Sequence, residues 1–107
     1  MQIQMQAFGR RQGSLRKIIA DDLLAHPHPV LFLQEFKSPE RAPGWSKILG
    51  IDLPGALNIK WEASSRMLTA RAIAKRGNTP HKLLGEFIAY LIERHGRKVA
   101  SVNIQLR

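Results

Sequence analysis

Alternation of apolar and polar residues is the feature that most constrains the fold of this chain. It occurs in four stretches: residues 1–7, 57–63, 67–75 and 100–106. A period of two residues is typical of a β-strand with one buried face. We therefore predict a strand in each stretch, and we expect residues 57–63 and 67–75 to form a hairpin through the short connection at 64–66.

The stretch at 67–75 also has a helical alternative. It contains three alanines in alternation and is followed closely by Gly77, which suits the end of a helix. A helix there, followed by a second one from Pro80, would resemble a helix-turn-helix that presents His81, Lys82 and Gly85 to a DNA groove. We prefer the strand because the alternation is even, but both possibilities stay open at this stage.

Two segments have the spacing of amphipathic helices. The first is Leu15–His26, with Ser14 as its N-cap and Pro27 directly after it. The second lies between Thr79, a candidate N-cap, and Gly96, with Pro80 at the first helical position. Apolar residues cover about half of the second helix, so we predict that it is the main core helix.

Two segments remain between the first helix and the hairpin. Residues 30–37 begin with Val-Leu-Phe-Leu, which is apolar on both faces and predicts a central strand. Residues 38–55 contain three prolines and three glycines, so we predict a long loop, of a length that is usually functional or mobile. A short helical turn around Trp45 is expected to hold part of this loop in place.

Together these elements predict a single domain over residues 1–107 with an α+β fold. Its order is β-α-β-β-β-α-β, with one mostly antiparallel sheet of about five strands and two helices packed on it. The terminal strands, 1–8 and 100–106, are expected at the sheet edges. The predicted centre of the core combines the second helix with three strands and consists of Ile59, Trp61, Phe87, Ile88, Leu91, Val102 and Ile104.

Charge is the second strong signal. The chain has 17 Lys and Arg against 8 Asp and Glu, a net charge of +9. Residues 1–53 carry 7 basic and 5 acidic side chains (+2), whereas residues 54–107 carry 10 basic and 3 acidic side chains (+7). Such an imbalance favours a face that attracts polyanions, the alternative being that these cations only solvate the surface.

The candidate binding residues are seven of the ten cations of the second half together with one tryptophan. Point charges on a broad surface suit contacts to phosphate groups. Trp45 lies between Arg41 and Lys47, a pattern that suits stacking of bases beside phosphate contacts. The alternative for Trp45 is that it anchors its loop by packing. The predicted nucleic-acid-binding set is Trp45, Arg66, Arg71, Lys75, Arg76, Lys82, Arg97 and Lys98.

Several kinds of site are not predicted. The chain has no cysteine, which excludes disulfides, thiol nucleophiles and Cys-ligated zinc. His26 and His28 are better explained by the proline-rich end of a helix than by a metal. Adjacent Asp21 and Asp22 point about 100° apart on a helix, so they do not form a catalytic pair. Asp21 is instead expected to pair with Lys17. No catalytic residue, metal or cofactor is predicted.

The sequence therefore predicts a small, non-enzymatic nucleic-acid-binding protein that contacts phosphates of DNA or RNA through its C-terminal half. One alternative is a protein-interaction module or homodimeric adaptor that uses the 38–55 loop or an edge strand. Another is a metal-free ribonuclease in which Arg71, Lys75, His81 and His95 converge. A cytoplasmic location is expected because no secretory signal is recognisable and the longest apolar run is Phe87–Ile92.

Overall fold

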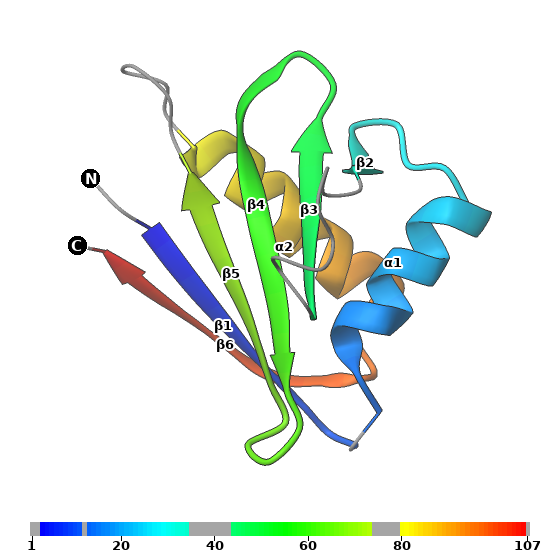
Figure 1. The fold of residues 1–107 in the computed structure, drawn as a ribbon, viewed down its shortest axis with the longest axis vertical. Coiled ribbons are helices and arrows are strands. Elements are labelled where there is room, and N and C mark those ends of the chain that lie inside the picture. Colours follow the sequence, from blue (N-terminus) through cyan, green and yellow to red (C-terminus); the bar gives the residue numbers. More distant parts are fainter. Residues whose placement is uncertain (1–2, 12, 35–43, 74–79, 107) are drawn as a thin grey trace.

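The computed structural model describes residues 3–11, 13–34, 44–73 and 80–106, and it places them in one β-sheet and two helices (Figure 1). The predicted α+β class is confirmed, with six strands in place of about five. In chain order the elements are β1 (Ile3–Gly9), α1 (Leu15–Ala25), β2 (Leu31–Gln34), β3 (Trp45–Gly50), β4 (Leu53–Glu62), β5 (Met67–Ile73), α2 (His81–His95) and β6 (Val99–Leu106).

The six strands form one antiparallel sheet in the order β2-β3-β4-β5-β1-β6. β6 lies at an edge, as predicted. β1 does not, because β5 and β6 pair with its two sides. The prediction that both terminal strands are edges was therefore wrong for β1. Local alternation shows that one face of a strand is buried, but it carries no information about how many neighbours the strand has.

The hairpin predicted from the alternation is present. β4 and β5 pair in register from Ala56 opposite Ile73 to Glu62 opposite Met67. The helix-turn-helix alternative is therefore wrong for residues 67–73, which form β5, and residues 74–79 lie outside the described part. Gly55 shows why this hairpin needs a glycine: its φ is +96°, and an added Cβ would lie 2.8 Å from the carbonyl oxygen of Ile73.

The two helices follow the sequence signals closely. The Ser14 hydroxyl accepts a hydrogen bond from the Lys17 backbone N–H at 3.2 Å, which confirms Ser14 as the N-cap of α1. α2 ends with Gly96 as its C-cap, also as predicted. Pro80 is the N-cap residue of α2, so the helix begins at His81, one position later than expected, and Thr79 lies outside the described residues.

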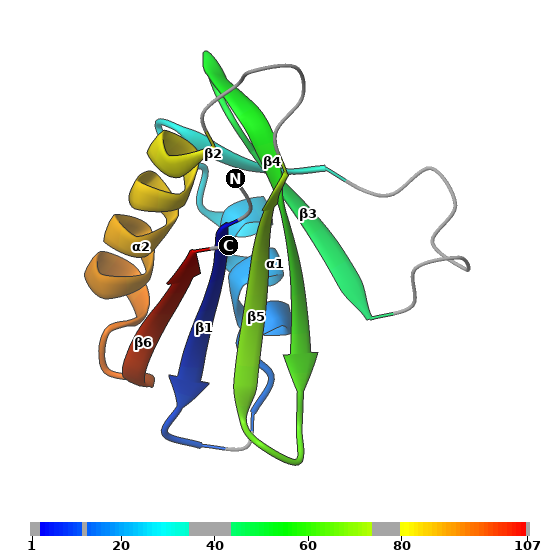
Figure 2. The same ribbon diagram turned by 90° about the vertical axis from the view of Figure 1, so that its left-hand side faces the viewer.

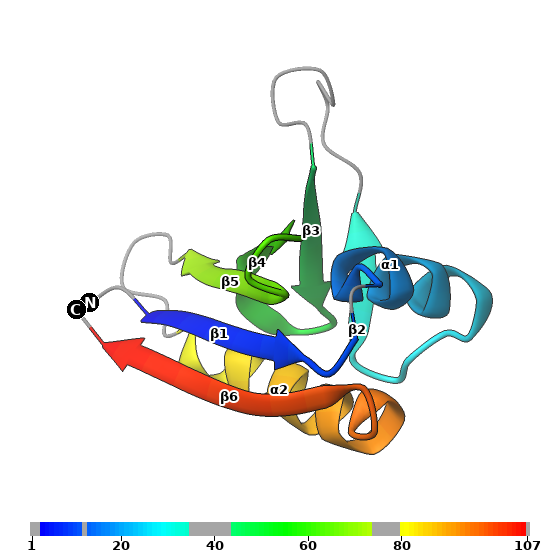
Figure 3. The same cartoon turned by 90° about the horizontal axis from the view of Figure 1, so that it is seen from below.

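Both helices pack on the same face of the sheet. In Figure 1 α2 lies behind the strands and α1 lies beside β3 and β2. Figure 3, seen from below, shows that the strongly twisted sheet curves around the two helices. Alternate residues of each central strand face the helices and are buried, including Met5 of β1, Ile59 of β4 and Leu68 of β5. None of the described helices packs on the opposite face, and we call it the open face.

The predicted core is correct in its centre and wrong at one margin. Phe87, Leu91 and Ile59 are buried, and Ile88 and Trp61 pack against the core while partly exposed. Val102 and Ile104 are not core residues, because 36% and 48% of their surfaces are exposed. They lie on β6, on the same face as the buried side chains of β1, but at the margin of the helix layer.

The segment predicted as a long loop contains two pieces of strand. Residues 45–50 form β3 and β4 begins at Leu53, so the loop prediction for 38–55 was wrong over these residues, while 38–43 lie outside the described part. The glycines and prolines made this short strand difficult to recognise in the sequence. Its residue Ile48 is buried on the side of the sheet that faces the helices. Asp52, with a φ of 58°, helps to form the tight turn that joins β3 to β4.

The strand predicted at 30–37 is described only as β2, since residues 35–37 lie outside the described part. It was expected in the centre of the sheet but lies at its edge, with Leu31 buried and Phe32 40% exposed. The prediction rested on apolar residues on both faces of the strand, which is typical of a central strand. In the structure β2 pairs only with β3 among the described residues, so it is an edge strand. No described helix is long and apolar enough to cross a membrane.

Candidate nucleic-acid interface

A row of polar side chains crosses the open face of the sheet. Because neighbouring strands are in register, residues from different strands line up in rows across this face. The register places one residue from every strand in a single row, and none of the six is apolar. In the order from edge to edge, this row consists of Gln105, Gln4, Arg71, Asn58, Lys47 and Gln34.

Trp45 lies in the next row, directly opposite Lys60 on the neighbouring strand. The Lys60 ammonium is 5.6 Å from the centroid of the Trp45 ring, and the Arg71 guanidinium carbon is 5.3 Å from it. Both distances are within the range of cation–π attraction. The structure thus brings together two residues of the predicted set, Trp45 and Arg71, and adds Lys60. We call these three residues the Trp45 cluster.

The Trp45 cluster lines a shallow hollow on the open face with a volume of about 260 Å³. Four further residues complete its lining: Gln4, Glu62, Met67 and Thr69. Lys60 and Arg71 are exposed, and within the described part of the chain neither forms a salt bridge with a carboxylate. The lining of the hollow therefore has two cations against one carboxylate, that of Glu62, a balance that favours an anionic ligand.

Asn58 adds a polar group to the same surface. Its side-chain oxygen is buried and has no hydrogen-bond partner among the described residues. Asn58 lies opposite Arg71 on β5 and opposite Lys47 on β3. An unpaired buried amide oxygen lowers stability unless a donor such as a water molecule reaches it.

A second group of cations gathers where three connections meet at one end of the sheet. The Arg66 guanidinium donates to the carbonyl oxygen of Arg10 at 3.3 Å, and the Arg10 N–H donates to the carbonyl oxygen of Lys98 at 3.0 Å. These contacts join the turn after β1, the turn of the β4–β5 hairpin and the turn before β6 (Figure 2, bottom). The cations of this basic end are exposed; they are Arg10, Arg11, Arg66, Arg97 and Lys98.

The predicted set of eight residues is therefore distributed over several places. Arg71 and Trp45 meet on the open face, and Arg66, Arg97 and Lys98 belong to the basic end. Lys82 is exposed on α2, which packs on the other face of the sheet, and Lys75 and Arg76 lie outside the described residues. The sequence reasoning missed Lys60, Arg10 and Arg11. Lys60 was detectable, because it stands on the polar side of the alternation at 57–63, next to the strand that carries Arg71.

A cluster of polar side chains joins the two helices instead of forming part of the open face. Asp22 of α1 accepts hydrogen bonds from the Tyr90 hydroxyl at 2.7 Å and from Arg94 at 3.2 Å. The Tyr90 hydroxyl also lies 2.9 Å from Nε2 of His95, and Arg94 donates to the carbonyl oxygen of His26 at 2.8 Å. Asp22 therefore has a structural role that the sequence reasoning did not predict.

The surroundings of this Asp22 cluster shift three pKa values. Burial disfavours the Asp22 carboxylate, but hydrogen bonds from Tyr90 and Arg94 and the charges near it outweigh burial, so the pKa of Asp22 lies below its usual value. Burial and the Asp22 carboxylate raise the pKa of Tyr90 well above its usual value. Burial lowers the pKa of His95, assisted by Lys98 and Arg94 and opposed by Asp22.

The described members of the predicted ribonuclease site do not converge. His95 is 6% exposed and faces Tyr90 and Asp22, whereas Arg71 is on the open face of the sheet. His28 is used locally, since its Nδ1 accepts hydrogen bonds from the Val30 and Leu31 backbone at 3.1 and 3.0 Å. No three His, Asp or Glu side chains in the described segments are placed to hold a metal ion.

Comparison of this chain with family models, with curated proteins and with solved structures found no match. The function of the open face must therefore be inferred from the chemistry of its own residues.

Proposed function

We propose that this chain is a non-enzymatic nucleic-acid-binding protein and that it binds through the open face of its sheet. The observation that carries the proposal is the Trp45 cluster, in which two cations that form no salt bridge with a described carboxylate lie within 6 Å of one aromatic ring, on the face of the sheet that no described helix covers. A net charge of +9 supports it, since the field of such a protein attracts polyanions over a long range.

The chemistry of the cluster suits single-stranded nucleic acid. An aromatic ring offers a surface on which an unpaired base can stack, and neighbouring cations contact the phosphates on either side of that base. The amide side chain of Gln4, in the adjoining row, lines the same hollow and can donate and accept hydrogen bonds with base edges. In a duplex the faces of the bases are already stacked on each other, so the aromatic ring would add little.

The basic end supplies a second group of cations that can contact the same single strand of nucleic acid. Arg66 follows the β4–β5 turn, five positions before Arg71, which corresponds to about 17 Å along an extended strand. Thr69 and Met67 lie between them on the open face and line the hollow. A single strand laid along β5 would contact the Trp45 cluster first and the basic end next.

The first test measures affinity for a fluorescent single-stranded oligonucleotide at increasing salt. Replacing both Lys60 and Arg71 with glutamine is expected to weaken binding by roughly tenfold or more and to reduce the salt slope by about 1.4, because each lost phosphate contact to a single strand removes about 0.7 from it. Both side chains are exposed, so the variant is expected to fold normally, which circular dichroism checks.

The matched control removes the same amount of charge from the helix layer, by replacing Lys17 of α1 and Lys82 of α2 with glutamine. These side chains are also exposed, and we expect this variant to retain nearly the affinity of the original protein. An equal loss in both variants would show that only net charge matters. Binding that does not weaken between roughly 50 and 200 mM salt would exclude phosphate contacts as its main source.

A further inference from the structure

The edge formed by β6 is unusual for a charged protein. A free edge strand offers unpaired backbone N–H and C=O groups, and soluble proteins commonly block such edges with charges or prolines. The eight residues of β6 include no charged residue and no proline, in a chain in which 23% of residues are charged. The register with β1 is regular from Ser101 to Leu106, and the irregularity lies at the other end, near Gly9.

The side chains of β6 that point to the helix layer are apolar and exposed. They are Val102 (36% exposed), Ile104 (48%) and Leu106 (67%), and they pair with the buried residues Ala7, Met5 and Ile3 of β1. The inner apolar layer of the sheet thus continues across β6, but the described helices no longer cover it. Exposed apolar side chains in a continuous patch mark a surface that is covered in another state.

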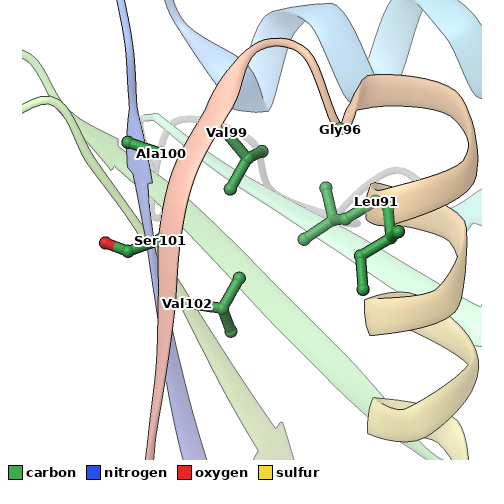
Figure 4. A pocket seen from close by; sticks show the side chains of 7 residues that line it. Leu91, Gly96, Val99, Ala100, Ser101 and Val102 are labelled. Atoms are coloured by element: carbon green, nitrogen blue, oxygen red, sulfur yellow. The ribbon is translucent and has the colours of Figure 1, made fainter.

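A groove between β6 and α2 adjoins this patch. It has a volume of about 230 Å³ and its lining includes Leu91 and Ile92 of α2 and Val99 and Val102 of β6. Figure 4 shows the side chains of Leu91, Val99 and Val102 pointing into the space between the helix and the strand. Ile92 is 65% exposed, so the helix side of the groove also presents an apolar side chain to solvent.

We propose that β6 pairs with β6 of a second copy of this chain, antiparallel and around a twofold axis, so that the two sheets become one. The occupant is a second copy because β6 is complementary to itself. In an antiparallel pair that keeps the two helix layers on one side, apolar Val102 and Ile104 of one copy face the same kind of residue of the other. Ser101, Asn103 and Gln105 meet on the open face in the same way.

The contact strip on β6 has no charged side chain, so pairing with a second β6 buries no charge at the interface. Pairing also leaves the Trp45 cluster accessible, because β3 and β6 are separated by three strands in the sheet order. The proposed dimer is therefore independent of the proposed nucleic-acid binding, and each can fail without the other.

The test is the oligomeric state measured by sedimentation equilibrium over a wide range of protein concentrations, without nucleic acid. The original chain is expected to dimerise. Ile104→Lys is expected to weaken dimerisation on the order of 100-fold, because two unpaired ammonium groups would be buried near the axis. The matched control is Leu24→Lys on α1, since Leu24 is 68% exposed and outside the groove, and it should dimerise normally.

If Ile104→Lys proves unfolded by circular dichroism, Leu106→Lys takes its place, because Leu106 is 67% exposed and near the end of β6. Three results would overturn the proposal. The original chain could remain monomeric up to hundreds of micromolar, a dimer could persist in the folded β6 variant, or Leu24→Lys could lose the dimer to the same extent as the β6 variant.

Discussion

Replacing Phe87 with alanine is expected to lower the free energy of unfolding by about 3–5 kcal/mol. Phe87 is fully buried on the main core helix and stacks against Tyr90 with ring centroids 6.1 Å apart. The loss combines the removed apolar contacts with the cavity that the surrounding side chains cannot fill. Chemical denaturation followed by circular dichroism measures it directly.

The control for Phe87 is Leu24→Ala, which also shortens a large apolar side chain in a helix. Leu24 is 68% exposed, so its replacement is expected to change the unfolding free energy by about 0.5 kcal/mol or less. Equal stability of the Phe87 variant and the original chain would mean that α2 does not provide the centre of the core.

The second large effect is expected at Asp22. Replacing it with alanine removes the carboxylate that accepts from both the Tyr90 hydroxyl and the Arg94 guanidinium, although Arg94 keeps the carbonyl oxygen of His26, and we expect a loss of about 2–3 kcal/mol in unfolding free energy. Asp21→Ala is the matched control, because Asp21 is the adjacent carboxylate on the same helix and is exposed. Its replacement should cost about 0.5 kcal/mol or less. A similar loss in both variants would contradict the role of the Asp22 cluster.

The Asp22 cluster also predicts a pH dependence of stability. The pKa of His95 is lower in the folded chain, so below about pH 6.5 the unfolded chain binds the extra proton and stability falls. For this one proton the slope cannot exceed about 1.4 kcal/mol per pH unit, and it disappears below the folded pKa of His95. Asp22, whose pKa is also lowered, adds a second loss below about pH 3.8. His95→Gln should abolish the first phase in denaturation curves and leave the second one.

The fold was predictable where one face of an element is buried along its whole length. Local patterns of apolar residues predicted these elements correctly. They are the alternation around Met5, Ile59 and Leu68 and the helical spacing around Phe87. β3 was missed because Gly44 and Gly50 flank a strand in which Ile48 is the one buried residue. A strand with so little buried surface is stabilised by its neighbours, and local sequence does not show which strands those are.

The remaining errors in the predicted core and site arise because the sequence does not show the order of the strands in the sheet. Val102 and Ile104 alternate like core residues, but two helices do not cover a six-stranded sheet, and the edge strand β6 stays uncovered. The same limit applies to the candidate site. Trp45 and Arg71 were both selected from the sequence, yet their proximity depends on β3, β4 and β5 being consecutive neighbours. That proximity, and the part played by Lys60 between them, follows from tertiary structure alone.

The most direct measurement of binding by the open face is a titration of isotope-labelled protein with a short single-stranded oligonucleotide, followed by NMR. Binding at the Trp45 cluster is expected to shift the indole N–H of Trp45 and the backbone amides of Thr69 and Arg71 the most. Amides of the exposed side of α2, such as those of Lys82 and Glu86, should change little. Shifts concentrated on α2, or no shifts with the oligonucleotide in excess, would contradict nucleic-acid binding by the open face.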